Sequence, residues 1–189
     1  MGTINNAYIS VEIADQGLES LREGLRVLLG QEVAGCEVAS SAAHVSIAYG
    51  EGEVTVEALD RVASEIASLP FSVRVSGFEF LEGSATAFDY LVVKLDSTGA
   101  FNAAVEAAQG CMKTKTFNGG FCSHISLLKF PKGSVTREWA EQVISEMNVC
   151  QSVATALGRR VSLQGHNISV FDPERRCHVT KSFQAQAAA

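Results

Sequence analysis

The chain lacks any stretch that approaches 18 consecutive apolar residues, and its N-terminus lacks a basic region followed by an apolar one. We therefore expect neither a signal peptide nor a membrane span, because a helix needs about 20 apolar residues to cross the hydrocarbon core. The opening Met-Gly does not complete a myristoylation pattern, since Asn6 stands where Ser or Thr is required. The sequence predicts a cytoplasmic protein without a membrane partner.

Cysteines are few, and their spacing suits neither disulfides nor zinc. The five cysteines form an odd set without a CxxC pair, which argues against a disulfide framework and a structural zinc site. No run of Asp, Glu or His has metal-ligand spacing, and Gly119-Gly120 lacks the rest of a phosphate-binding fingerprint. We expect reduced thiols, no metal and no cofactor.

The chain also lacks an excess of positive charge. Its formal net charge is −6, whereas proteins that hold long nucleic acid usually neutralise many phosphates with a basic face. A long duplex is therefore not an expected partner, but a small anionic ligand needs only a few local donors. Apolar residues make up 47% of the 189 residues, a composition and length typical of one folded domain, which we expect to be a monomer.

The sequence does contain an internal repeat at about half its length. The block from Tyr8 to Ile13 matches Tyr90 to Leu95 at an offset of 82, and residues 55–66 match 136–147 at an offset of 81. Between them, His44-Val-Ser-Ile recurs as His124-Ile-Ser-Leu at an offset of 80. Three blocks in one order indicate a duplication. We predict a single domain over residues 1–183, with repeats at about 7–81 and 89–171 and a flexible tail at 184–189.

Each repeat is expected to hold a strand, a helix, a histidine strand, a second helix and a last strand. Two stripes at helical spacing predict the first two helices, one after a cap at Asp15 and one between Thr55 and Pro70. Their apolar members are Leu18, Leu21, Leu25 and Leu28, then Leu59, Val62, Ile66 and Leu69. Alternation predicts a strand over 71–80, a looser counterpart over 160–171 and a further strand over 177–183. Such interleaving favours an α+β or α/β fold of two related lobes with a cleft between them.

The repeated triplets His44-x-Ser46 and His124-x-Ser126 carry the candidate chemistry. Residues i and i+2 of a strand point to the same face, so each triplet presents an imidazole beside a hydroxyl. Because histidine titrates near pH 6.5, one neutral and one protonated imidazole can serve as general base and general acid in phosphodiester cleavage. The serine hydroxyls would donate hydrogen bonds to the phosphoryl oxygens.

Two His-x-Ser triplets inside repeats that span nearly the whole chain resemble the signature of the two-histidine (2H) phosphoesterase superfamily. All four motif positions match. The resemblance implies a bilobal α+β fold, with two duplicated lobes of sheet plus helices around a central cleft, and no metal. It also implies phosphodiesterase activity on the 2′,5′ linkages or 2′,3′-cyclic phosphates of a small nucleotide or short oligonucleotide. Members include RNA cyclic phosphodiesterases related to 2′-5′ RNA ligases, and viral or phage enzymes that destroy oligonucleotide signals of host immunity.

Candidate substrate-binding residues lie in the breaker-rich segment 112–121, which leads into the second histidine strand. We predict a mobile loop in which Lys113 and Lys115 meet substrate phosphates and Phe117 stacks on a base. Tyr8 and Tyr90 occupy matching positions of the repeat and could line the cleft, although burial in the core is the more common outcome for tyrosine.

Other interpretations stay open at this point. The same fold could sequester a nucleotide without turnover, although binding alone does not need two histidines of opposite protonation state. RNA-end processing of the 2′-5′ RNA ligase kind could proceed by reversal of hydrolysis, whereas ATP-dependent ligation would need an adenylated lysine that is not found. A thiol nucleophile at Cys122 beside His124 lacks a third orienting group. His178-Val-Thr180 has no partner in the repeat and is assigned to chance or to a supporting role.

Overall fold

The structure is a computed structural model that describes residues 2–40, 42–67, 72–83, 86–96, 99–115, 123–149, 160–162, 168–172 and 177–181. The helices of these residues are α1 (Gln16–Leu29), α2 (Val56–Ala67), α3 (Gly99–Cys111) and α4 (Arg137–Val149). The strands are β1 (Thr3–Asn5), β2 (Tyr8–Glu12), β3 (Glu37–Val38), β4 (His44–Tyr49), β5 (Glu53–Thr55), β6 (Ser72–Leu81), β7 (Phe88–Asp96), β8 (His124–Pro131), β9 (Arg160–Ser162), β10 (Ile168–Asp172) and β11 (Cys177–Lys181).

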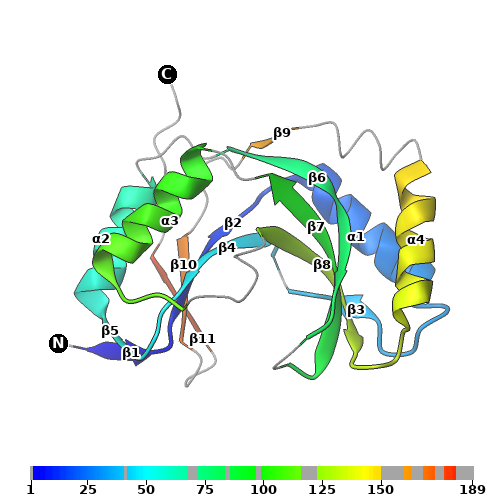
Figure 1. Cartoon of the computed structure of the whole chain (residues 1–189), viewed down its shortest axis with the longest axis horizontal. Coiled ribbons are helices and arrows are strands. Elements are labelled where there is room, and N and C mark those ends of the chain that lie inside the picture. Colours follow the sequence, from blue (N-terminus) through cyan, green and yellow to red (C-terminus); the bar gives the residue numbers. More distant parts are fainter. Residues whose placement is uncertain are drawn as a thin grey trace.

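One antiparallel sheet runs through the molecule in the order β11-β10-β2-β4-β8-β7-β6-β9, and β3 pairs with β8 beside this path. A separate ribbon is made of β1 and β5. The strands β4 and β8 are adjacent at the centre, and on either side of them the sheet forms the two lobes visible in Figure 1. The lobe with β4 also contains β2, β10 and β11, and the lobe with β8 also contains β7, β6 and β9.

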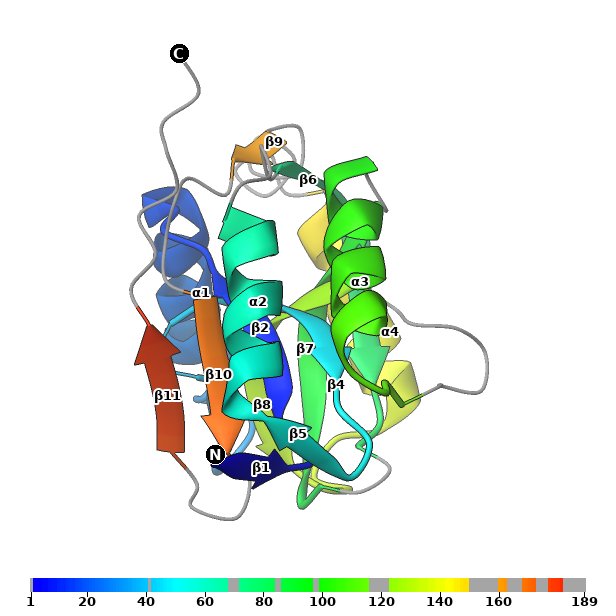
Figure 2. The ribbon, with the colours of Figure 1, turned by 90° about the vertical axis from the view of Figure 1, so that its left-hand side faces the viewer.

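Two helices cover each lobe. Figure 2 shows α2 and α3 side by side over the lobe with β4, while α1 and α4 contact the lobe with β8. Each lobe thus takes one helix from each half of the chain. Strands are exchanged as well, because β6 follows α2 but pairs with β7, and β10 pairs with β2. Neither half can therefore complete a lobe alone. In the part of the chain that the structure describes, no helix is long and apolar enough to cross a bilayer.

Side-chain caps set the starts of three helices. Asp15 accepts a hydrogen bond of 2.8 Å from a backbone N–H three residues on, as expected for the N-cap of α1. The starts of α2 and α4 have the same cap in each half. Thr55 Oγ1 accepts from the N–H of Ala58 at 3.2 Å, and Thr136 Oγ1 accepts from the N–H of Trp139 at 3.2 Å.

The core lies between the sheet and the helices. The central strands contribute six side chains that are at most 1% exposed, Val45, Ile47, Ile125, Leu127, Leu128 and Phe130. From α2, the predicted residues Leu59, Val62 and Ile66 are buried, whereas Leu69 lies outside the described residues. On the other lobe, Trp139 meets the ring of Phe130 edge-on at 5.9 Å between centroids.

Two expectations about the elements are wrong. Leu28 does not face the core but is 59% exposed. The buried residues of α1 are Leu18, Arg22, Leu25 and Leu29. At 3.6 residues per turn these four positions share one face, and residue 28 falls beside it. The segment 160–171 is not one strand, because β9 pairs with β6 and β10 pairs with β2 on opposite sides of the sheet.

Candidate active site

The central strands meet through one registered pair, in which Val45 stands opposite Ile125. Both side chains are fully buried at 0% exposure. Successive residues of a strand project to opposite faces, so the neighbours of this pair project away from the core. Because the strands are antiparallel, His44 takes the position opposite Ser126, and Ser46 takes the position opposite His124.

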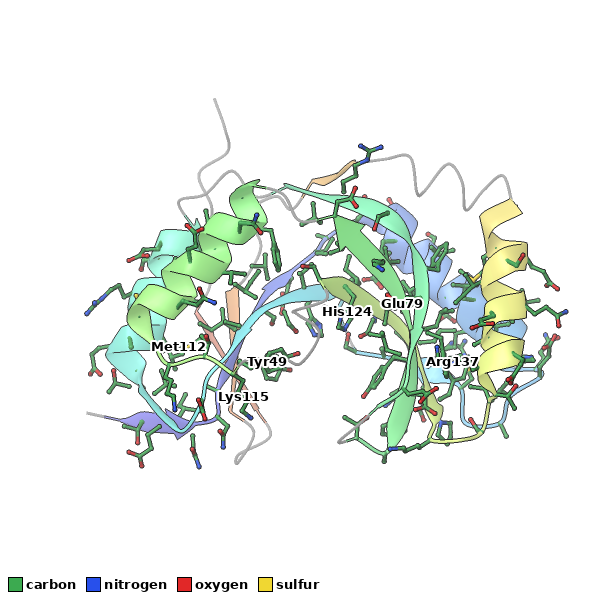
Figure 3. The ribbon with its side chains drawn as sticks, in the orientation of Figure 1. Tyr49, Glu79, Met112, Lys115, His124 and Arg137 are labelled. Carbon is green, nitrogen blue, oxygen red and sulfur yellow. The ribbon has the colours of Figure 1, made fainter. Side chains whose placement is uncertain are left out.

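The two motifs therefore interlock as a square on one face of the sheet, here named the front face. Its corners are His44, Ser126, His124 and Ser46, and all four side chains are half-buried. The histidines occupy one diagonal, and diagonal neighbours of an antiparallel pair stand about 7–8 Å apart. Figure 3 shows His124 at the junction of the two lobes.

A β-bulge follows each motif at once. The register of β4 with β2 skips Ile47, and the register of β8 with β7 skips Leu127. The bulged residues are 80 positions apart, as are the motifs. A bulge puts two residues of one strand opposite one of its partner and changes which side chains share a face. Tyr49, three residues beyond Ser46, therefore lies on the front face, where strict alternation would have placed it in the core.

Tyr49 is a site residue that the sequence pattern did not identify. Its hydroxyl donates a hydrogen bond of 3.1 Å to Ser46 Oγ, and its ring lies 5.4 Å from that of Tyr8, centroid to centroid. Burial raises the pKa of Tyr49, with the Ser46 bond acting in the opposite direction. Burial, followed by the influence of Tyr49 and Tyr90, raises the pKa of Tyr8 to about 12. Both hydroxyls thus keep their protons at neutral pH.

Tyr90 is the counterpart of Tyr8 in the second half of the chain. It stands on β7, which β4 and β8 separate from β2, yet it contributes to the raised pKa of both Tyr8 and Tyr49. The chain contains only these three tyrosines. All three are half-buried rather than in the core.

The imidazole of His44 has a backbone partner that fixes its orientation. Its Nδ1 lies 3.3 Å from the carbonyl oxygen of Ala42, and because a carbonyl can only accept, Nδ1 carries the proton. The lone pair of the neutral ring is then on Nε2. The residue before each histidine makes the same kind of backbone hydrogen bond. Ile13 N–H donates to Ala43 O at 2.8 Å, and Leu95 N–H donates to Ser123 O at 3.0 Å.

The charges beside the two histidines are of opposite sign. In the sheet register, Glu12 stands directly opposite His44, and Lys94 stands directly opposite His124. The Nζ of Lys94 lies 3.4 Å from a carboxylate oxygen of Glu79 on β6, and the two side chains are 52% and 38% exposed. Glu79 therefore offsets only part of this positive charge. The duplicated motifs thus sit in unequal electrostatic surroundings.

Comparison with known proteins finds relatives in structure but not in sequence. No protein-family model and no curated protein matches the chain. Usb1 from Kluyveromyces marxianus gives a TM-score of 0.57 at 16% identity, over 94% of this chain and 97% of that one. Usb1 with uridine monophosphate gives 0.56 at 15% identity, over 93% and 97%. The MHV ns2 PDE domain gives 0.45 at 18% identity, over 69% of this chain and 86% of that one.

Usb1 belongs to the two-histidine phosphoesterase superfamily, and its structure matches nearly the whole chain in both directions. The chain has the two-histidine phosphoesterase fold. The predicted bilobal α+β architecture is thereby confirmed. An identity of 16% shows the fold alone, so the chemistry rests on the residues of this chain.

In this two-histidine phosphoesterase fold, the start of the predicted lysine loop is fixed to the end of β4. Lys115 N–H donates to Tyr49 O at 2.8 Å, and Glu51 N–H donates to Lys113 O at 2.9 Å. The Nζ of Lys113 also pairs with the Glu51 carboxylate at 2.9 Å. Residues 113–115 are thus bonded to the end of β4, and the rest of the predicted loop, residues 116–121, lies outside the described residues. Figure 3 shows Lys115 beside Tyr49. Phe117 lies outside the described residues.

The remaining candidates lie apart from the front-face square or outside the described residues. His178 belongs to β11, which β10 and β2 separate from β4. Cys36 and Cys111 are free and half-buried, and burial raises the pKa of the Cys36 thiol. Cys122 lies outside the described residues. Among the residues that are described, no three His, Cys, Asp or Glu side chains come together as metal ligands would.

Proposed function

We propose that this chain is a phosphodiesterase that acts on short or cyclic oligonucleotides or on 2′,3′-cyclic phosphate ends, with His44 and His124 as general acid and base. The register of β4 and β8 carries the proposal, because it implies two imidazoles on the diagonal of one square. Imidazoles at opposite corners can act on the attacking and the leaving oxygen of one phosphoryl group. That is the arrangement an in-line displacement at phosphorus needs.

In this mechanism His124 is the base and His44 is the acid. The neutral ring of His124 takes the proton from the attacking hydroxyl, which belongs to water or to the neighbouring ribose. The oxygen of that hydroxyl forms a bond to phosphorus as the bond to the leaving oxygen breaks. Protonated His44 then gives its proton to the leaving oxygen. Proton exchange with water returns both rings to their starting states.

The cross-strand charges support this assignment. A carboxylate beside an imidazole favours its protonated form, and Glu12 stands opposite His44. The ammonium of Lys94 stands opposite His124. Side chains directly opposite in an antiparallel ladder have Cβ atoms about 4.5–5.5 Å apart. We therefore assign the acid to His44, beside the carboxylate, and the base to His124, beside the ammonium.

Ser46 and Ser126 would stabilise the transition state. Each serine stands in register with the histidine of the other motif, so its hydroxyl faces the position of the phosphoryl group. The Tyr49 hydroxyl already donates to Ser46 Oγ, which leaves the proton of Ser46 available for a nonbridging oxygen. Removing one such donor typically lowers kcat by about 10²–10³-fold.

A small nucleotide substrate fits the rest of the molecule. The net charge of −6 opposes a long polyanion, whereas the half-buried tyrosines on the front face can hold a base by stacking. The fold neighbour Usb1 has been seen with uridine monophosphate, a ligand of this size. We therefore propose that the substrate is a single nucleotide or an oligonucleotide of a few nucleotides, whose phosphodiester is cleaved at the square.

The test is turnover of a panel of 2′,3′-cyclic nucleotides, 2′-5′ oligoadenylates and cyclic dinucleotides in the presence of EDTA. We expect one class to be cleaved, and His44→Ala and His124→Ala each to lower kcat by at least about 10²-fold. His178→Ala is the matched control and should retain activity. Activity that returns only with a divalent ion would refute the mechanism. Tight binding without turnover of any member would identify a nucleotide-sequestering protein instead.

A further inference from the structure

The helix α1 carries a buried arginine at a position where a core residue would be expected. Arg22 is 1% exposed, and it is the largest fully buried side chain of the described residues. Its Nη1 pairs with Glu19 one turn earlier at 2.7 Å. Its Nη2 donates to the backbone carbonyl of Ser40, while its Nε has no partner within the described part of the chain. Glu19 itself is 45% exposed, so the ion pair is buried on the arginine side only.

This pair contacts the residues immediately before His44 at two points. Arg22 binds the carbonyl of Ser40, and Glu19 Oε1 accepts the N–H of Ala43 at 3.2 Å. Ser40 Oγ in turn donates to the carbonyl of Ala42 at 2.6 Å. That carbonyl is the oxygen that accepts from Nδ1 of His44. A continuous set of hydrogen bonds therefore runs from the helix to the imidazole.

The second half of the chain shows that the fold does not need an ion pair here. With Gly17 matched to Gly99, the positions of Glu19 and Arg22 correspond to Phe101 and Ala104 on α3. Both counterparts are apolar and buried, at 3% and 0% exposure. Burying an arginine carries a large desolvation cost, and well-packed apolar residues are often as stable or more so. The charged pair is therefore poorly explained by stability alone.

We propose that Glu19 and Arg22 are positioning residues for His44. They fix Ser40, Ala42 and Ala43 so that the Ala42 carbonyl holds Nδ1–H and directs Nε2 to the front face. Both side chains bind backbone groups that precede His44, so their effect is on the geometry of proton transfer. As a role in catalysis this rests on the proposed function, but the orientation of the imidazole can be measured without it.

The kinetic test uses Glu19→Gln/Arg22→Met, which removes both charges and keeps similar volumes. The matched control is Glu23→Gln/Arg26→Met, since Glu23 and Arg26 form an exposed pair at the same spacing on the same helix. We expect the first variant to lose at least about 10-fold in kcat, with KM within about two-fold, because small misplacements of catalytic groups have large effects. Its melting temperature should not fall. The control should match the wild type in every measurement.

The second readout is the tautomer of His44 by ¹⁵N NMR, at a pH where the ring is neutral. The wild type and the control variant should show Nδ1–H, whereas Glu19→Gln/Arg22→Met should gain Nε2–H. Ser40→Ala removes the hydroxyl that donates to the Ala42 carbonyl and accepts from Arg22 Nη2 at 3.4 Å. It should change the tautomer ratio in the same direction with little risk to folding.

The outcomes separate the two proposals. A wild type without turnover but with the expected tautomer change would refute the phosphodiesterase and retain the positioning device. An unchanged tautomer in both Glu19→Gln/Arg22→Met and Ser40→Ala would overturn the positioning role, whatever the activity. The same conclusion would follow if the exposed-pair variant lost as much kcat as the buried-pair variant.

Discussion

The hydrogen bond from Tyr49 to Ser46 gives a prediction of defined size. In Tyr49→Phe the ring remains, and only the hydroxyl 3.1 Å from Ser46 Oγ is lost. A neutral hydrogen bond contributes about 0.5–1.5 kcal/mol, and about 1.4 kcal/mol corresponds to a tenfold change in rate. We expect kcat to fall about 2- to 10-fold. KM should change little, because the aromatic surface available to a base is preserved.

The pH dependence of this effect also follows from the structure. Burial raises the pKa of Tyr49, so its hydroxyl loses its proton only at a higher pH than free tyrosine does. The donor is therefore present throughout the neutral range. The ratio of wild-type to Tyr49→Phe kcat should stay constant between about pH 6 and 9.

A double-mutant cycle measures whether Tyr49 acts through the serine. Ser46→Ala should lower kcat by about 10²–10³-fold if the hydroxyl donates to the phosphoryl group. If Tyr49 only orients that hydroxyl, adding Tyr49→Phe to Ser46→Ala should have no further effect on kcat. Steady-state kinetics of the four proteins on the best substrate decide the point. Additive losses would refute the reasoning, and a change in KM alone would identify Tyr49 as a base-binding residue.

Three further predictions address charge and stability. Glu12→Gln should move the high-pH limb of the rate profile to lower pH, because the charged form of His44 loses its carboxylate neighbour; a shifted low-pH limb would instead reverse the acid and base assignment. Lys115→Ala should raise KM and weaken its salt dependence, whereas Lys113→Ala should not, since Glu51 already neutralises Lys113. Asp89→Ala should lower the unfolding free energy by about 2–4 kcal/mol in a denaturant titration, because this buried carboxylate accepts N–H groups from the turns after β6 and β8.

The paired triplets could be read from the sequence because a strand has a fixed period. Residues 44 and 46 must share a face in any extended segment, and the same holds for 124 and 126. The helix starts at Asp15 and Thr55 could be predicted for the same reason, because a cap requires only a side-chain oxygen just before the first turn of the helix. Predictions of this kind succeed because a few neighbouring residues determine the outcome.

Features that depend on pairing could not be predicted in this way. Alternation places Tyr49 on the core face, and only the bulge at Ile47 turns it to the front. A signal was present, since two consecutive apolar residues follow each motif serine and break the alternation at the same offset. The burial of Arg22 left no such signal, because its partners at residues 40–43 are distant in sequence. The split of 160–171 into β9 and β10 likewise depends on partners in opposite lobes.

A duplicated fold raises a problem that a single motif does not. Two copies of one motif on a pseudo-twofold would give both histidines the same surroundings, yet acid and base must differ in protonation at the start of turnover. The difference therefore has to come from residues around the motifs. This chain has one such difference in the sheet and another in the helices behind it. Across the strands, Glu12 matches Lys94 in the other half.

Behind the sheet, the asymmetry continues in the helices. The hydrogen-bonded pair of Glu19 and Arg22, which leads to His44, is matched by apolar Phe101 and Ala104 in the other half. The double variant Glu12→Lys/Lys94→Glu exchanges the cross-strand charges. It tests whether these charges or the hydrogen bonds from the helix decide which histidine is the acid and which is the base. If the cross-strand charges dominate, the two histidines should exchange roles and activity should persist with a shifted pH profile. If the helix network dominates, the exchange should abolish turnover, because His44 would keep its orientation but lose the charge that keeps it protonated.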